Sequence, residues 1–477
     1  MKKNILRLFS ALTIICVLSV SAFAAPGLVN PGVDSGEVPE DEPKQVLSGE
    51  GTSDNPYVIK SAEEFLLAAK MVETDNAQYG ADVYSIESCI DFDGVYFVPL
   101  GNEKVPFKGT LLGNGHVLKN IPITDIPVFG VVGCMTSGSV KNVHAVFKSD
   151  EYTLNSLSRF GGIVGEIHTQ SGSTAVDIGG CSVTGEVTIN TEKALIWGGV
   201  VGVIDADGAD VVITDSASYI DFVLSTSSDG YIGGFAGKCE AGTGYVFEMK
   251  NCISTGDICT TKAKTGIYVS GFAGFVNKDE NGWSGWTEED ATLFASSNAL
   301  FENCFATGNV TSLGFGGKLI AYLGTFITST KMYYSSSQTL TSLYTTSAGK
   351  SCSASNLKSS TYLSSTLGFD MTNKWTLSED GTLLHKGKCS ECMLAVFEIT
   401  SDGVNVANMT GEYTLVVSDF KENVLQSVKF VPVSGEISVS FEELGIDTAE
   451  ADYIKAFLFE ADTIKPVRNS KTISFEE

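Results

Sequence analysis

Four polar residues recur at the same place in successive segments of the chain and could together hold a ligand. They are Glu186, Asp221, Asp257 and Asn309. Carboxylate and amide oxygens along one edge suit Ca²⁺ or a polyhydroxylated ligand. The competing interpretation is structural, because Asp and Asn beside glycine are ordinary turn residues. If each repeat makes two turns of the chain, successive side chains lie about 10 Å apart, which is too far for one ion to bridge.

A second group of carboxylates, Asp205, Asp207 and Asp210, lies within one short loop segment. Calcium takes 6–8 oxygen ligands, and backbone carbonyls could supply those that the three side chains lack. The spacing does not match an EF-hand loop, and a solvated turn is the simpler interpretation. Ca²⁺ is therefore the single cofactor that the sequence leaves open, and no other is expected.

Two tryptophans, Trp283 and Trp286, lie in a polar segment that interrupts the repeat spacing described below. Inserted loops on repeat proteins often carry binding residues, and indole rings can stack on sugars. Trp197 instead precedes an apolar strand, so we expect it to be buried.

Catalytic constellations are sparse. Polysaccharide lyases and glycosidases need paired carboxylates, or a carboxylate with a base, in a groove. Asp91 and Asp93 share a strand face, but an entry turn explains them, and His116, His144 and His168 suit local hydrogen bonds. The sequence contains no phosphate loop, nucleophile elbow or zinc-binding helix. We therefore expect a protein that is not an enzyme, with a polysaccharide-degrading enzyme as the alternative.

Bulk composition restricts the partners. The chain has 477 residues, of which 43% are hydrophobic and 18% charged, and its formal net charge is −26. This apolar content is enough for a large core, so the chain is not disordered. So acidic a chain repels phosphate backbones, which argues against nucleic acid as a partner.

Residues 1–24 resemble a signal peptide. Lys2, Lys3 and Arg7 precede an apolar stretch, and Ala22–Ala24 forms a small-residue cleavage site. Residues 25–49 read as an acidic flexible linker. No later stretch is long and apolar enough to enter a membrane. We expect a secreted, extracellular protein associated with the cell surface.

The repeat is the strongest feature of the sequence. Five segments share the pattern x-G-x-x-G, in which the first position is Phe, Gly or Ser. Their second residues are Gly130, Gly162, Gly199, Gly234 and Gly271, which are 32, 37, 35 and 37 residues apart. Gly, Val, Ile and Thr dominate these units without a 3.6-residue stripe, so helical repeats are excluded. Two short strands per unit suit a parallel β-helix better than a propeller blade. One inward apolar ladder would contain Ile163, Val200, Phe235 and Phe272.

The ends of the array differ from its middle. Ser61–Glu64 reads as a capping box that opens a helix, which would cover the first repeat. The array extends to about Lys386, so the repeat domain spans residues 50–388. From residue 389 to 477 glycine thins out and period-two strands indicate a small β-sandwich.

Ten cysteines remain after the expected cleavage, and several fall at matching repeat positions. That pattern favours buried thiols in the core. Cys389 and Cys392 form a lone C-x-x-C, which suits a local bridge better than a zinc site.

The chain resembles the bacterial GLUG-repeat proteins. Phe107–His116 looks like the segment that opens their repeat arrays, and Phe129–Gly133 is similar to the GLUG motif itself. Thr366–Asp370 with Trp375 looks like their closing segment. The resemblance implies an exported, adhesin-like protein with a right-handed parallel β-helix, and it carries over no catalytic residues. Leu112 stands where the family usually has Asp.

These observations predict an all-β fold: a right-handed parallel β-helix (a solenoid) with an N-terminal capping helix, followed by a small β-sandwich. The predicted function is adhesin-like binding of glycans or of host and other extracellular proteins through the solenoid face or its loops. A polysaccharide lyase or glycoside hydrolase and a structural spacer of the cell envelope remain the alternatives.

Overall fold

The computed structural model describes residues 47–226, 228–242, 244–262, 266–277, 299–323, 327–346, 348–378, 381–386, 388, 396–407, 412–422, 424–434, 437–460 and 466–475. The chain divides into two compact units, of which one is Val46–Cys389 and the other contains Ser390–Glu477. The expected domain boundary between residues 388 and 389 lies one residue from this division. The signal peptide and nearly all of the linker lie outside the described residues.

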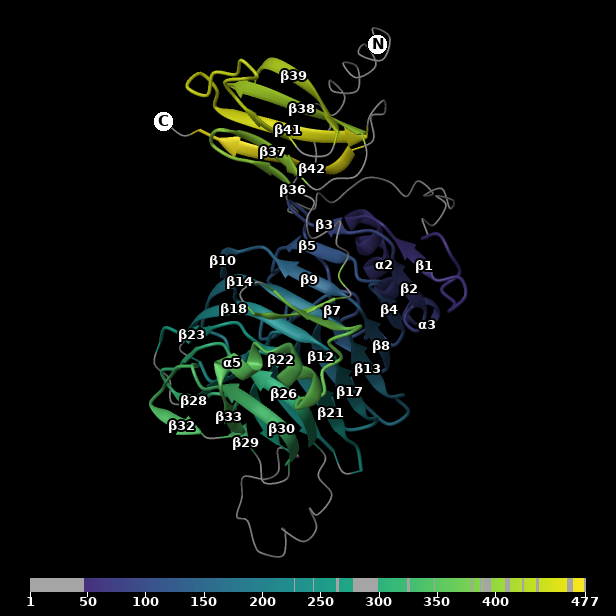
Figure 1. Cartoon of the computed structure of the whole chain (residues 1–477). Helices are drawn as coiled ribbons and strands as arrows, with labels where there is room; N and C mark the ends of the chain where they lie inside the picture. Colours follow the sequence, from purple (N-terminus) through teal and green to yellow (C-terminus); the bar gives the residue numbers. More distant parts are fainter. Residues whose placement is uncertain are drawn as a thin grey trace, which may run out of the picture. The chain divides into compact units, whose positions relative to one another are not determined.

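The first unit consists mostly of parallel strands in three sheets, which we name A, B and C (Figure 1). Sheet A contains β1 (Tyr57–Ile59), β2 (Val83–Ile86), β3 (Ile90–Asp91), β4 (Thr110–Leu112), β5 (Val117–Ile121), β8 (Gly138–Lys141), β9 (His144–Phe147), β10 (Asp150–Thr153), β13 (Val176–Gly179), β14 (Ser182–Thr191), β17 (Val211–Thr214), β18 (Ala217–Thr226), β21 (Phe247–Lys250), β22 (Ile253–Ser254), β23 (Ile258–Thr260), β26 (Ala299–Ala306), β27 (Val310–Thr311), β30 (Ile327–Ser335), β31 (Leu340–Thr341) and β33 (Lys350–Cys352). Sheet B contains β7 (Val132–Met135), β12 (Val164–Thr169), β16 (Val201–Ala206), β20 (Ala236–Ala241), β25 (Ala273–Asn277) and β29 (Ile320–Leu323). Sheet C contains β6 (Val128–Phe129), β11 (Arg159–Gly161), β15 (Leu195–Gly198), β19 (Gly230–Gly233), β24 (Ile267–Ser270), β28 (Phe315–Gly317) and β32 (Tyr344–Thr346).

Each complete repeat contributes four strands, and each strand pairs with the equivalent strand of the next repeat. Strands β13 and β14 lie in sheet A, β15 in sheet C and β16 in sheet B, and they pair in register with β17, β18, β19 and β20. The mostly β fold with parallel sheets is confirmed. The expected two strands per unit is wrong, because short corners such as residues 180–181 and 199–200 divide each repeat into four strands. Equivalent residues of successive repeats are therefore direct neighbours, about 4.8 Å apart.

The glycine motifs form the sharp corner between sheets C and B. A β-carbon on Gly198 would lie 2.0 Å from the Val201 carbonyl oxygen, and one on Gly202 would lie 2.4 Å from the Gly165 carbonyl oxygen. Both contacts are with backbone, which cannot rotate away. The corner therefore requires residues without a side chain, which explains why the motif recurs.

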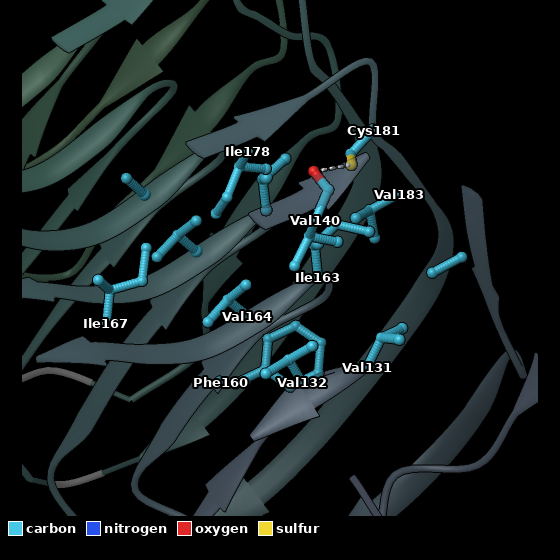
Figure 2. Packing of buried hydrophobic residues seen from close by; sticks show 14 of the residues in the cluster. Val131, Val132, Val140, Phe160, Ile163, Val164, Ile167, Ile178, Cys181 and Val183 are labelled. Atoms are coloured by element: carbon cyan, nitrogen blue, oxygen red, sulfur yellow. Dashed lines mark hydrogen bonds between the residues drawn. The ribbon is translucent and has the colours of Figure 1, made fainter. Parts of the chain in front are cut away.

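Inward-facing side chains form one continuous core through the repeats of the first unit. Figure 2 shows part of this core around Ile163. The expected ladder of Ile163, Val200, Phe235 and Phe272 is confirmed, because all four side chains are fully buried. Phe235 and Phe272 stack with ring centroids 4.9 Å apart. Burying side chains of this size contributes about 1.5–3 kcal/mol each, so the ladders are the main source of stability.

A ladder of residues in the left-handed backbone conformation bends the chain within sheet A. Its members have positive φ and include Asn142, Asp215, Asn251 and Asn303. The Asn303 amide donates to Asn251 Oδ1 (3.0 Å), and the Asn251 amide donates to Asp215 Oδ1 (3.0 Å). Asn and Asp tolerate this conformation best among residues with side chains.

Helix α2 (Ala62–Thr74) begins at the expected capping box. The Ser61 hydroxyl accepts a hydrogen bond from the Glu64 amide (3.2 Å), and Glu64 Oε2 accepts one from the Lys60 amide (2.6 Å). Phe65 of this helix packs against Phe92 and Phe97 in the core of the first repeats. The short helix α3 (Asn76–Tyr79) follows.

The last part of the first unit folds back over sheet A. It contains α5 (Ala354–Leu357), α6 (Ser360–Ser365), β34 (Trp375–Leu377) and β35 (Leu383–His385). Trp375 and Leu383 share a cluster with Ala217, Ile253 and Phe305 of sheet A. The repeat pairing thus ends at β33, earlier than the expected Lys386, because this segment packs onto the sheet instead of extending it.

The second unit has two antiparallel sheets. One orders β36 (Val396–Ile399), β37 (Gly403–Ala407) and β40 (Ile437–Ser440), and the other orders β39 (Val424–Ser434), β38 (Glu412–Lys421), β41 (Tyr453–Glu460) and β42 (Pro466–Ser474). Val404 and Val406 of the first sheet share a core with Leu415, Val417 and Leu458 of the second.

The cysteine thiols lie mostly in the core. Cys181, Cys252 and Cys304 are fully buried and occupy equivalent positions in their repeats. The Cys181 thiol donates to the Val140 carbonyl (3.6 Å; Figure 2). Cys89 is disulfide-bonded, and Cys389 and Cys392 lie outside the described residues. No helix in the described part of the chain has the length and apolar character needed to cross a membrane.

Candidate functional site

The candidate site is a groove between the outer faces of sheets C and B, which we call the C/B groove. On sheet C, in-register outward positions are Arg159, Ile196, Tyr231, Tyr268, Phe315 and Tyr344. On sheet B, they are Cys134, Glu166, Val203, Lys238, Phe275 and Tyr322. Side chains of the two sheets contact one another across the glycine corner, so the outer angle between the sheets is concave.

The earlier repeats form a polar cleft of about 1010 Å³ in this groove. Arg159 of β11 donates to Glu166 of β12 across the cleft and also to Glu103. Lys238 and Glu240 of β20 form an ion pair of 2.8 Å, and both side chains are only 12% exposed. These charge-assisted contacts hold polar groups at fixed positions on the cleft walls.

Ion pairs also set the electrostatics of the cleft. Burial disfavours the charged form of Arg159, but Glu166 and Glu103 outweigh burial, so the pKa of its guanidinium is raised. Burial and the neighbouring Glu166 carboxylate raise the pKa of the Cys134 thiol. Arg159 therefore stays charged, and Cys134 stays protonated at neutral pH.

In the later repeats, aromatic side chains line the C/B groove. Tyr268 and Phe315 stack along sheet C with ring centroids 4.7 Å apart and planes at 9°. Phe275 and Tyr322 stack along sheet B with ring centroids 4.7 Å apart and planes at 7°. Tyr268 meets Tyr322 edge-on across the corner at 5.8 Å. Offset and edge-on arrangements of this kind add to the stability gained from burial alone.

Stacking determines which ring surfaces a ligand can reach. A ring between two neighbours has both faces covered, so it offers its edge and, for tyrosine, its hydroxyl group. Tyr344 is the last rung of the sheet C ladder and remains 52% exposed. Leu343 beside it is 64% exposed. The aromatic part of the groove is therefore a strip of ring edges and hydroxyl groups that ends on an exposed ring.

The predicted ladder of Glu186, Asp221, Asp257 and Asn309 exists, and the side chains of Asp221, Asp257 and Asn309 each accept a hydrogen bond from the next repeat. Glu186 and Asp221 are in-register neighbours, so each repeat makes one turn of the chain, and the 10 Å spacing that two turns would produce does not apply. Asp221 Oδ1 accepts from the Asp257 amide (2.6 Å), and Asp257 Oδ1 accepts from the Asn309 amide (2.6 Å). Burial raises the pKa of the Asp221 carboxyl, the Asp257 amide lowers it, and the Asp257 and Glu186 carboxylates raise it. Asp221 and Asp257 thus bind backbone amides of the next repeat, which favours a structural role, although Glu186 and Asp221 lie within the strands β14 and β18 and not in a turn.

The predicted metal residues do not converge. Asp205 pairs with His168 (2.7 Å), Asp207 lines the C/B cleft, and Asp210 Oδ1 accepts from the Val246 amide (2.8 Å). Across the described ranges, no group of three or more His, Cys, Asp or Glu side chains is arranged to hold a metal ion. The Asp205, Asp207 and Asp210 prediction fails because the strand β16 and the following turn direct the three carboxylates to different partners.

The predicted aromatic site at Trp283 and Trp286 lies outside the described residues. Trp197 is fully buried, as expected, and stacks on Phe160 at 4.7 Å.

The residues considered for catalysis have local partners. Asp91 Oδ1 accepts from the Asp93 amide (3.0 Å) and from the Asn120 amide group (2.7 Å). His144 Nδ1 is 2.8 Å from the Ser182 hydroxyl, and burial holds its pKa well below the usual value, with Lys388 and His385 acting in the same direction. Burial also lowers the pKa of His116, against the opposing effect of Glu87.

The groove residues escaped prediction from the sequence, although a signal for them exists. Sheet C contributes the residue two places before the first residue of each motif (for example Gly161, Gly233 and Ser270), such as Arg159 and Tyr231. Sheet B contributes the residue directly after the last glycine, such as Glu166 and Lys238. Aligning the repeats on their glycines and reading these two columns would have identified the groove.

The known proteins similar to this chain include a halomucin and a solved bacterial structure. No family model matches the chain. Halomucin from Haloquadratum walsbyi (strain DSM 16790 / HBSQ001) is 30% identical over an alignment of 209 residues that covers 40% of this chain and 2% of halomucin. The chain thus corresponds to a very small part of that relative. A crystal structure from Bacteroides ovatus, described as a candidate immunoglobulin A1 protease, is similar with a TM-score of 0.53 and 21% identity, over 72% of this chain and 95% of the other. That likeness concerns the fold alone.

Proposed function

We propose that the protein is a secreted or cell-surface binding protein, adhesin-like, that recognises glycans or extracellular proteins through the C/B groove. Its first unit is a right-handed parallel β-helix of the GLUG-repeat class, and the second is a small β-sandwich. The in-register pairing of β13–β16 with the next repeat and the glycine corners support this architecture. The observation that carries the function is the groove, where a polar cleft continues into a strip of half-buried aromatic residues.

A binding role accounts for the groove better than catalysis does. Glycoside hydrolysis needs one carboxyl group whose pKa is raised so that it can act as an acid. In the cleft, Glu166 and Glu240 are paired with Arg159 and Lys238, and Asp205 lies 2.7 Å from His168, so a substrate would have to displace a partner within the protein to reach any of these carboxyl groups. The export signal and the likeness to part of halomucin support a location outside the cell.

An array of glycans and matrix proteins, probed with the mature chain, tests the proposal. Replacing exposed Tyr344 by Ala should weaken binding at least several-fold. Tyr96→Ala is the matched control, since Tyr96 is 67% exposed and does not belong to the groove. Equal effects of the two variants, or none, would reject the groove as the site.

Two further assays separate the alternatives. Release of reducing ends from any bound polysaccharide would favour the enzyme, and the absence of all binding would favour a structural spacer. Deleting residues 278–289 removes Trp283 and Trp286 and leaves the groove residues in place. Loss of binding in this variant alone would move the site from the groove to the inserted segment.

A further inference from the structure

We infer that the C/B groove takes an extended, neutral or amine-bearing glycan chain and rejects polyanionic ones. This rests on the proposed function, because it names the ligand class of the same groove. The inference comes from the shape of the groove, the pairing of its cations and the chemistry of its aromatic part.

The shape favours a chain over a single sugar. The cleft volume of about 1010 Å³ is at the upper end of pockets that hold drug-sized ligands, about 300–1,000 Å³. The aromatic strip then continues from repeat to repeat along sheet C, through Tyr268, Phe315 and Tyr344. A ligand with its own repeating unit can use successive rungs, whereas a monosaccharide would contact only one or two.

The pairing of charges disfavours an anionic ligand. Four carboxylates line the cleft, from Glu166, Asp205, Asp207 and Glu240, against the two cations Arg159 and Lys238. Each cation is already held by a carboxylate of the protein, so a uronate or sulfate group would have to displace that partner. The formal net charge of −26 adds a long-range repulsion of polyanions.

The same charges favour an amine. Among the described residues, Asp207 takes part in no ion pair, and it lines the cleft beside Asp205, whose partner is His168. An ammonium group placed near Asp207 would gain a charge-assisted hydrogen bond without displacing a cation of the protein. The tyrosine hydroxyl groups and ring edges of the strip suit the hydroxyl groups and apolar C–H groups of uncharged sugar rings.

Calorimetric titration of the mature chain with three hexasaccharides of matched length tests the inference. The probes are the N-acetylglucosamine hexamer (neutral), the glucosamine hexamer at a pH where its amines are charged, and the galacturonate hexamer. We expect the amine hexamer to bind about tenfold more tightly than the neutral one, an advantage that shrinks with added salt. We expect the galacturonate hexamer to bind at least tenfold more weakly than the neutral one.

Two single substitutions test whether Asp207 causes the preference for the amine hexamer. Asp207→Asn should remove most of the amine advantage and leave the neutral hexamer unchanged. Glu73→Gln, which removes the same charge from the exposed surface of α2, is the control and should change neither affinity. Equal losses in both variants would show that net charge alone is responsible and would overturn the site.

The outcomes also distinguish this inference from the proposed function. Galacturonate binding as tight as that of the neutral hexamer would overturn the ligand class and leave groove binding intact. An amine hexamer no tighter than the neutral one would overturn the role of Asp207 alone. Failure of all three hexamers, with an extracellular protein bound on the array, would overturn the glycan assignment while the binding function stands.

Discussion

A single added methyl group at the corner of sheets C and B should destabilise the first unit, although simple chain entropy predicts the opposite. Gly198 does not have positive φ, so alanine can adopt its backbone conformation. In such positions Gly→Ala commonly stabilises by about 0.4–1 kcal/mol, through the unfolded chain. The new β-carbon, however, would lie 2.0 Å from the Val201 carbonyl oxygen and 2.6 Å from the Gly237 amide nitrogen.

The clash should outweigh the gain in entropy. Both contacts are with backbone atoms, one of them in the next repeat, so the corner itself must open. Overpacking of this kind costs about 1–3 kcal/mol, and more where the surroundings cannot relax. After subtraction of the entropic gain, we expect Gly198→Ala to lower the free energy of unfolding by about 1–2 kcal/mol.

Gly179→Ala is the matched control. Its β-carbon would approach only the ends of two side chains, Lys141 Nζ at 3.1 Å and Thr214 Oγ1 at 3.2 Å, which can move aside. We expect this variant to be neutral or slightly stabilised. The assay is urea unfolding followed by tryptophan fluorescence, since all four tryptophans belong to the first unit. A Gly198→Ala variant as stable as Gly179→Ala would refute the tight corner.

Three further predictions concern the core, the buried histidines and the thiols. Because Trp197 is fully buried against Phe160, Trp197→Ala should lower the free energy of unfolding by about 3–5 kcal/mol, and Trp197→Phe should lower it clearly less. Urea unfolding followed by circular dichroism measures both losses, and equal losses would contradict this packing. Burial lowers the pKa of His385 to about 4, and Lys388 and Lys374 act in the same direction while Asp215 opposes them. The neutral His385 therefore contributes to folding stability above pH 6.5, and this contribution is lost as the pH falls through about 4. That loss amounts to about 3 kcal/mol, and His385→Gln should flatten the pH dependence of stability in this window; an unchanged slope would contradict it. Half-buried Cys259 should react with a thiol reagent well before fully buried Cys181, whose pKa burial raises to about 12, and mass spectrometry of labelled peptides would show the order.

The sequence predicted those features of the fold that depend on side-chain size. Ile163, Val200, Phe235 and Phe272 form the expected inward ladder because apolar residues at equivalent repeat positions must share one interior. The glycines were recognised as a repeat, but their role as the corner of two sheets became clear only from the backbone contacts of residues such as Gly198.

The site was harder to predict because it depends on which residues meet across that corner. The acidic ladder through Asp221 and Asp257 indicates a ligand site in the sequence, yet Oδ1 of each residue accepts a backbone hydrogen bond from the next repeat. Arg159 and Glu166 are seven residues apart and look unrelated in the sequence, but the corner brings their side chains together.

The most direct test of the account is the register between neighbouring repeats, because the ladders, the corners and the groove all depend on it. Nitroxide labels at Glu186→Cys and Asp221→Cys, in a Cys259→Ser background, report on two in-register positions of β14 and β18. Parallel pairing places their backbones about 4.8 Å apart, so electron paramagnetic resonance should show strong dipolar broadening, and labels at 186 and 257, two repeats apart, should show less. A spectrum from the 186/221 pair no broader than the sum of the single-label spectra would contradict the stacking of the repeats.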